Sequence, residues 1–275
     1  MATGIALTIG LNAVDPKHYA GWSGELAACE ADAKDMANIA KSKKFQVETL
    51  LTKDATRAKF LENVSKNAKV LKSGDIFMLS YSGHGGQLPD LNNDENDKQD
   101  ETWCLFDGQL VDDEINSMMA GFAAGVRVLI FSDSCHSGTV SKALESYGRP
   151  NPLTASSGEP RRPKCMPREY IGAVYRENQA FYDEILKKPL VKEEDIKASA
   201  LLISGCQDNQ FSMDGERNGL FTSNLLAVWK DGKYSRSYRN FCRDIVKRMP
   251  REQTPNYYLT GVKNLKFESQ TPLQI

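Results

Sequence analysis

The sequence has little histidine, no paired cysteine motif and no long apolar run, and each of these absences excludes a class of protein. With three histidines and no CxxC or HxxxH pair, a structural zinc site is not expected. No hydrophobic stretch approaches the roughly 20 residues that a membrane-spanning helix needs. The formal net charge of −1 gives no reason to expect a nucleic-acid or membrane partner.

The start of the chain also lacks the marks of a secretory signal. Residues 1–12 have no basic segment and no small-residue cleavage motif, and they are typical of a first β-strand. The six cysteines show no framework spacing, so we expect reduced thiols and a cytoplasmic protein.

Apolar runs and amphipathic segments alternate along the chain, which predicts an α/β fold. Repeated β–α units of this kind favour a mainly parallel central sheet with helices on both faces. The expected strands are 5–11, 45–51, 76–79, 126–131, 200–206 and 256–260. The expected helices are 24–41, 56–72, 112–122, 219–230 and 238–248.

The stretch 142–199 differs from this pattern and divides the chain. Its part from Gly148 to Pro167 is polar and has no hydrophobic period, which we interpret as a long exposed loop. We therefore predict a catalytic region at 1–141, a connecting loop at 142–199, and a smaller region at 200–275 that completes the same domain.

A histidine and a cysteine follow two of the predicted strands. His84 lies in Tyr-Ser-Gly-His-Gly-Gly, and Cys135 lies in Ser-Asp-Ser-Cys-His-Ser-Gly. The carboxyl ends of parallel strands lie at one edge of a sheet, so the two side chains are expected to meet and form a thiolate nucleophile with its base. Backbone N–H groups at Gly85 and Cys135 would bind an oxyanion. Taken singly, a cysteine after a strand is more often a buried core residue, and a lone histidine is usually a surface or core residue. His136 is a rival base, although adjacent side chains usually point apart.

Together these motifs resemble the metacaspase and bacterial orthocaspase branch of the caspase-fold cysteine peptidases. The likeness extends to Gly21–Leu26, to Cys29–Asp32, to the segments 204–210 and 218–222, and to Gln253–Pro255. The resemblance implies a caspase-like fold, Cys135 as nucleophile, His84 as general base and acid, protein or peptide substrates, and a monomer.

Acidic residues near the expected site predict a preference for basic substrates. The family's pocket for the residue before the cut bond (the P1 residue) matches Cys29, Asp32, Ser82 and Asp133 here. A buried pair of carboxylates would favour Arg or Lys at P1. The same resemblance implies self-cleavage in the connection, with candidates at Arg161, Arg162, Lys164 and Arg168. The alternative is that the connection is only a solvated linker and is not a site of self-cleavage.

Calcium activation is a further property that the resemblance raises. The family's acids match Asp100, Asp112 and Asp113, but Lys142 stands where another aspartate is expected, and a cation opposes divalent binding. Asp112 and Asp113 would alternatively cap a helix. Three other functions stay open: a silent caspase-fold adaptor, a peptidase of other P1 specificity, and a non-proteolytic thiol enzyme.

Overall fold

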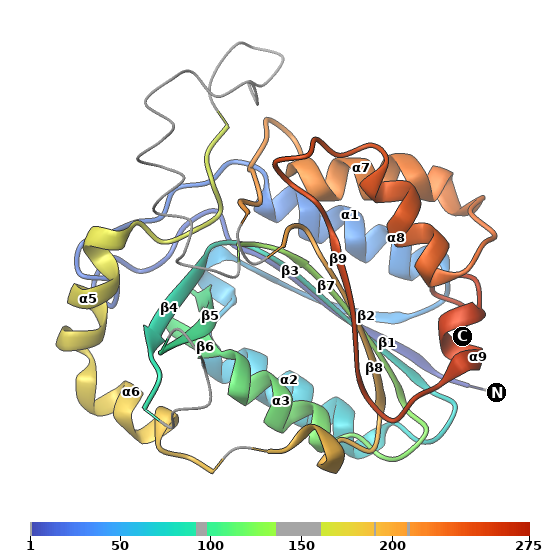
Figure 1. Cartoon of the computed structure of the whole chain (residues 1–275), viewed down its shortest axis with the longest axis horizontal. Coiled ribbons are helices and arrows are strands. Elements are labelled where there is room, and N and C mark those ends of the chain that lie inside the picture. Colours follow the sequence, from blue (N-terminus) through green and yellow to red (C-terminus); the bar gives the residue numbers. More distant parts are fainter. Residues whose placement is uncertain (1, 92–97, 136–160, 190, 208–209) are drawn as a thin grey trace.

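A six-stranded sheet forms the centre of the protein in a computed structural model, which describes residues 2–91, 98–135, 161–189, 191–207 and 210–275. The strand order is β2-β1-β3-β7-β8-β9 (Figure 1). All neighbours are parallel except β8 and β9. The strands are β1 Gly4–Gly10, β2 Gln46–Leu51, β3 Ile76–Ser82, β7 Arg127–Asp133, β8 Ser199–Ser204 and β9 Asn256–Gly261. The predicted mainly parallel sheet is confirmed.

Helices cover both faces of this sheet, as the amphipathic segments predict. The helices α1 (Cys29–Ser42), α7 (Leu220–Trp229) and α8 (Tyr238–Val246) lie on one face, and α2 (Arg57–Val70) and α3 (Asp112–Ala120) lie on the other (Figure 1). Successive strand residues point to opposite faces, so two cores form. Short helical turns complete this part of the fold: η1 Thr52–Asp54, η3 Glu193–Asp195, η4 Lys230–Gly232 and α9 Leu265–Ser269. None of the helices in the described residues is both long and apolar enough to cross a membrane.

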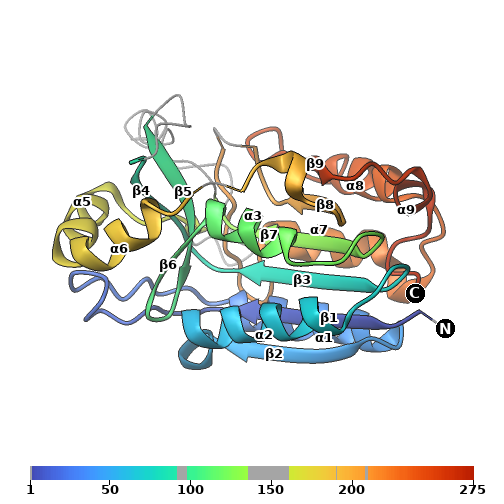
Figure 2. The ribbon, with the colours of Figure 1, turned by 90° about the horizontal axis from the view of Figure 1, so that it is seen from below.

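A small antiparallel sheet stands beside the carboxyl ends of the main strands (Figure 2). It comprises β4 (Gly85–Pro89), β5 (Gln99–Leu105) and β6 (Gly108–Val111). Helices α5 (Arg168–Glu177) and α6 (Gln179–Leu186) lie against it and enclose a third core. The sequence pattern gives no indication of this sheet, because β4 and β6 have only five and four residues and the strands show no regular alternation of apolar side chains.

The connection between the two predicted regions is more ordered than an exposed loop in its described part. It contains α5 and α6, and just before them Lys164 and Met166 are 0% and 4% exposed. The prediction of an exposed stretch up to Pro167 is therefore wrong at these two residues. Lys142 and the rest of the connection before Arg161 lie outside the described residues.

Candidate active site

Strand register brings the two sequence motifs together at one edge of the sheet. Ser82 and Asp133 are the last residues of β3 and β7 and are direct partners in the ladder. His84 and Cys135 each follow two residues later. Between them the chains are so close that a Cβ on Gly85 would overlap the carbonyl oxygen of Cys135. Only glycine fits there, which explains the glycine after His84.

The His84 imidazole is buried and held by its surroundings. Its Nε2 lies 3.1 Å from the carbonyl oxygen of Gly24, and the ring of Trp22 packs on it with centroids 4.7 Å apart. No hydrogen-bond partner for the buried Nδ1 is found in the described part of the chain. Burial lowers the pKa of His84 to about 3, and the Lys164 cation adds to the fall. The backbone of Gly24 and of Cys165 accepts hydrogen bonds from the ring and partly opposes it. Its resting form at neutral pH is the neutral imidazole, with Nδ1 able to accept a proton.

The Cys135 thiol is also buried, and Ser212 lies beside it. The backbone N–H of Ser212 donates to Cys135 Sγ at 3.1 Å, and the thiol lies 3.5 Å from the Ser212 carbonyl oxygen. Burial raises the pKa of Cys135 well above its usual value, and neighbouring thiols of Cys165 and Cys206 raise it further. The two candidate catalytic groups, the Cys135 thiol and the His84 imidazole, are therefore both uncharged at rest. His136 lies outside the described residues.

Lys164 fills the pocket that the sequence predicts for a basic side chain. Its Nζ lies 3.0 Å from Asp32 Oδ2, 3.2 Å from Asp133 Oδ2 and 2.9 Å from Ser82 Oγ. The fourth predicted pocket residue, Cys29, is buried next to Ser82, whose side chain hydrogen-bonds to it. All four residues named from the sequence thus surround one lysine ammonium group.

Charge balance in this pocket depends on the lysine. Burial alone would lower the pKa of Lys164, but Asp133, Cys29 and Asp32 outweigh it and raise that pKa well above the usual value. Burial raises the pKa of Asp32 to about 6, because the opposing effect of Lys164 only partly offsets desolvation and the nearby Asp133. Two buried carboxylates without a cation would be costly.

The backbone of Lys164 is bound as firmly as its side chain. Its carbonyl oxygen accepts hydrogen bonds from the N–H groups of Gly85 at 3.0 Å and Cys135 at 3.2 Å, which are the two amides predicted to bind an oxyanion. Its own N–H donates to the Ser212 carbonyl oxygen at 2.8 Å.

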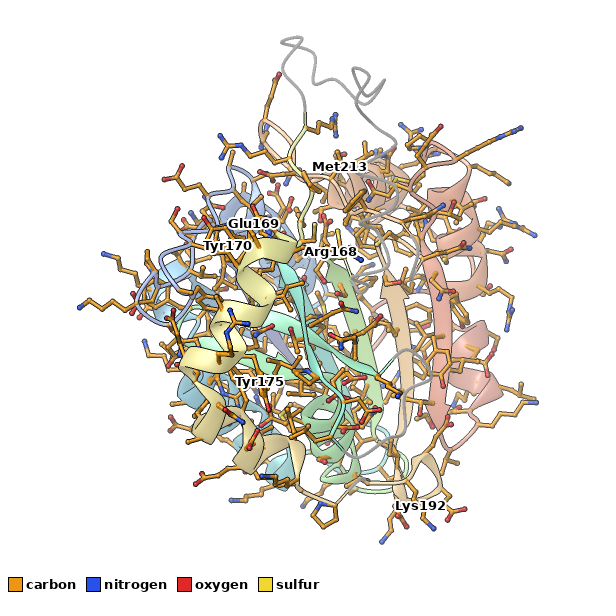
Figure 3. The ribbon with its side chains drawn as sticks, turned by 60° about the vertical axis from the view of Figure 1, so that its left-hand side comes forward. Arg168, Glu169, Tyr170, Tyr175, Lys192 and Met213 are labelled. Atoms are coloured by element: carbon orange, nitrogen blue, oxygen red, sulfur yellow. The ribbon has the colours of Figure 1, made fainter. Side chains whose placement is uncertain are left out.

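Residues on both sides of Lys164 extend this binding along the cleft. Upstream, the Arg162 carbonyl oxygen accepts from Asp214 N–H at 2.8 Å; downstream, Met166 N–H donates to the Gly85 carbonyl oxygen at 2.7 Å. Figure 3 shows Arg168 and Tyr170 at the start of α5, where this segment leaves the site, with Met213 beyond them. The chain from 162 to 166 is therefore held by backbone hydrogen bonds on both sides of Lys164, where it bends beside the two candidate catalytic residues.

The other three candidates for self-cleavage do not enter the pocket. Arg162 is exposed and donates from its guanidinium to the Glu25 carbonyl oxygen at 3.0 Å. Arg168 is the first residue of α5 and is exposed. Arg161 lies near Gly215, outside the acidic pocket. The structure brings Lys164 alone of the four to the acidic pair.

The acids proposed for calcium do not gather into a metal site. In the described ranges no three His, Cys, Asp or Glu side chains are placed to hold a metal ion. Asp112 and Asp113 lie in the first turn of α3, where negative side chains interact favourably with the positive end of the helix dipole. Glu114 accepts a hydrogen bond from the Val111 N–H at 3.2 Å. Calcium activation therefore stays a prediction, since this search covers only the described ranges.

Several residues of the site escape sequence reasoning. The Ser212 hydroxyl donates to Asp133 Oδ1 at 2.6 Å, and the Thr222 hydroxyl donates to Asp133 Oδ2 at 2.7 Å. Asn218 donates to Asp32 Oδ1 at 3.0 Å. These residues lie in segments remote from β3 and β7. Only the likeness of 218–222 to the family marks any of them beforehand.

The fold, with a histidine and a cysteine after two neighbouring strands, is that of the caspase-fold proteins. A family profile described as the caspase domain matches residues 3–266, and the chain belongs to this family. The fold is shared with caspase-1 from Spodoptera frugiperda, at a TM-score of 0.54 and 12% identity over 94% of this chain and 86% of that one.

More similar proteins come from a bacterium and from fungi. The crystal structure of protein GSU0716 from Geobacter sulfurreducens is 57% identical with a TM-score of 0.90, covering 98% of each chain. Metacaspase-1A of Aspergillus oryzae is 30% identical over 79% of this chain and 57% of its own. Metacaspase-1 of Pyricularia oryzae is 30% identical over 94% of this chain and 67% of its own. The chain thus spans little more than half the length of the Aspergillus metacaspase.

Proposed function

We propose that this protein is a cysteine endopeptidase that cuts after Arg or Lys, and that its first substrate is its own Lys164–Cys165 bond. The observation that carries the proposal is the pose of Lys164. Its side chain fills an acidic pocket while its carbonyl oxygen lies on two converging amides beside Cys135. A P1 residue in a peptidase needs both placements at once.

The chemistry follows from the groups around that carbonyl. Because the thiol and imidazole are both neutral at rest, the Cys135 proton moves to His84 Nδ1 as Sγ attacks the Lys164 carbonyl carbon. The Gly85 and Cys135 N–H groups stabilise the oxyanion. His84 then returns the proton to the nitrogen of Cys165, whose backbone lies against the imidazole. Water hydrolyses the resulting thioester.

Buried acids account for the choice of P1 residue. The carboxylates of Asp32 and Asp133 are nearly inaccessible, at 1% and 2% exposed, so a cationic P1 side chain is needed to balance them. An aspartate at P1 would add a third negative charge. Arginine, with its planar fork of donors, suits a pair of carboxylates at least as well as lysine.

Peptides that differ only at P1 test this preference. We expect the processed enzyme to hydrolyse the Arg and Lys peptides and to leave the Asp peptide uncut, because of the charge of the pocket. The Cys135→Ala variant is the blank, and an active-site thiol probe with Cys135→Ser distinguishes a silent adaptor from an active enzyme. A preference for Asp would refute the proposal.

Self-cleavage should slow as the pH falls through about 6. Asp32 becomes neutral below that value, since burial raises its pKa to about 6, and a neutral Asp32 holds the Lys164 ammonium less well. His84, with its pKa lowered to about 3, stays neutral there. The measurement is the rate of loss of full-length protein against pH. The Asp32→Asn variant should lack this inflection, and an identical inflection in both proteins would contradict the assignment.

A further inference from the structure

The fragment that begins at Cys165 stays bound after the Lys164–Cys165 bond is cut. Met166 is buried in the third core, where it packs among apolar side chains with Val174 and Tyr182 of α5 and α6. Tyr182 accepts a hydrogen bond from Gln109 N–H at 3.0 Å, and its hydroxyl lies 2.6 Å from His18 Nε2. Hydrolysis removes none of these contacts.

Docking of this fragment continues up to the catalytic residues. The Met166 N–H donates to the Gly85 carbonyl oxygen, and the ring of Tyr170 stacks on Trp22 with centroids 6.0 Å apart. Trp22 in turn packs on His84. The new amino terminus at Cys165 is therefore tethered on one side by Met166 and lies beside the thioester on Cys135.

Cys165 is not an ordinary leaving residue, because it brings a second thiol to the reaction. Residue 165 pairs with Gly85 in an isolated parallel bridge, directly after the carbonyl that contacts Cys135 N–H. The Cys165 thiol raises the pKa of the Cys135 thiol, so the two thiols are near enough to interact. After cleavage one residue offers both a thiol and a free α-amine to the acyl group.

We propose, on the basis of the self-cleavage proposed above, that Cys165 takes the acyl group back from Cys135 and re-forms the peptide bond. His84 takes the proton of the Cys165 thiol as Cys165 Sγ attacks the Lys164 carbonyl carbon. A bond to Cys165 Sγ forms, the bond to Cys135 Sγ breaks, and Cys135 leaves as a thiol that receives its proton from His84. The Cys165 α-amine then attacks the same carbon through a cyclic intermediate. The C–N bond forms, the bond to Cys165 Sγ breaks, and the amine proton passes to that sulfur. No water is consumed.

Religation competes with hydrolysis because it is intramolecular. A well-oriented internal nucleophile acts at an effective concentration on the order of 10⁵ M or more. Cleavage thus becomes permanent only when water intercepts the thioester or the fragment from Cys165 onward leaves. The precursor repeatedly opens and recloses, and net processing is slower than acylation.

Hydroxylamine tests this, since it captures the thioester irreversibly as a hydroxamate on Lys164. We expect it to speed the loss of wild-type precursor several-fold and to change Cys165→Ser little, because the serine variant lacks thiol capture and is already processed faster. The matched control is Cys206→Ser, which removes another thiol that contacts Cys135 but is not at the cut bond. Acceleration by hydroxylamine should persist in it.

The outcomes separate this proposal from the one on which it rests. If wild type and Cys165→Ser are cut after Lys164 at equal rates and respond equally to hydroxylamine, religation is refuted and self-cleavage stands. If no variant is cut after Lys164 with or without hydroxylamine, self-cleavage itself is refuted, and religation with it.

Discussion

Asparagine in place of Asp32 is expected to lower kcat/KM of the processed enzyme for Arg and Lys substrates by about 30-fold to several thousand-fold. Loss of one partner from a buried, hydrogen-bonded charge pair costs about 2–5 kcal/mol, and each 1.4 kcal/mol is about tenfold. Asp32 contacts the Lys164 ammonium at 3.0 Å and also accepts from Ser82 Oγ at 2.7 Å. The amide of asparagine carries no charge to offer the cation.

Asp35 provides the matched control for that experiment. It lies on α1 one turn beyond Asp32, and it accepts from Nδ2 of the same Asn218 at 3.0 Å. Asp35→Asn therefore removes a charge from the same helix face outside the pocket, and kcat/KM should stay close to wild type. Equal losses in both variants would show that the general acidity of α1 matters rather than the contact with P1.

Alanine in place of Lys164 is expected to abolish cleavage between residues 164 and 165 and to destabilise the precursor by about 3–5 kcal/mol, because it leaves buried charge uncompensated. Asp32 and Asp133 would face each other without a cation. Lys164→Arg should be cut. Stability is best measured by denaturant unfolding in the Cys135→Ala background, where no cleavage intervenes.

Arg162→Ala is the appropriate comparison for the lysine variant. It removes a basic residue two positions upstream, whose side chain makes an exposed hydrogen bond to the Glu25 carbonyl oxygen. We expect it to be cut after Lys164 as in the wild type. Continued cleavage after residue 164 in Lys164→Ala would contradict the proposed role of the pocket.

Much of the central fold could be predicted from the sequence, because long segments with a regular hydrophobic pattern indicate a helix or a strand without further information. The runs before His84 and Cys135 are continuous and apolar, as expected of strands buried on both faces, and they became β3 and β7. In contrast, β4 and β6 have only five and four residues, and β5 shows no regular alternation of apolar side chains, although each strand pairs with its neighbour along the chain. Local pattern carries too little information for such elements.

The pocket could be named residue by residue, but its occupant could not. Asp32, Ser82 and Asp133 lie in the motifs that resemble the family, and the structure gathers them. Lys164 was one basic residue among several in a polar stretch. Its burial results from contacts with Ser212, Gly85 and Cys135, which come from three separate segments. Tertiary contacts of this kind leave no local pattern.

The most direct test is to map the cut bond in the full chain. Wild type and Cys135→Ala are incubated with hydroxylamine, and the fragments are identified by intact mass and amino-terminal sequencing. The account predicts that wild type yields a fragment ending at Lys164 and another beginning at Cys165, while Cys135→Ala stays whole. Wild-type protein that stays whole, or is cut only at other bonds, would contradict it.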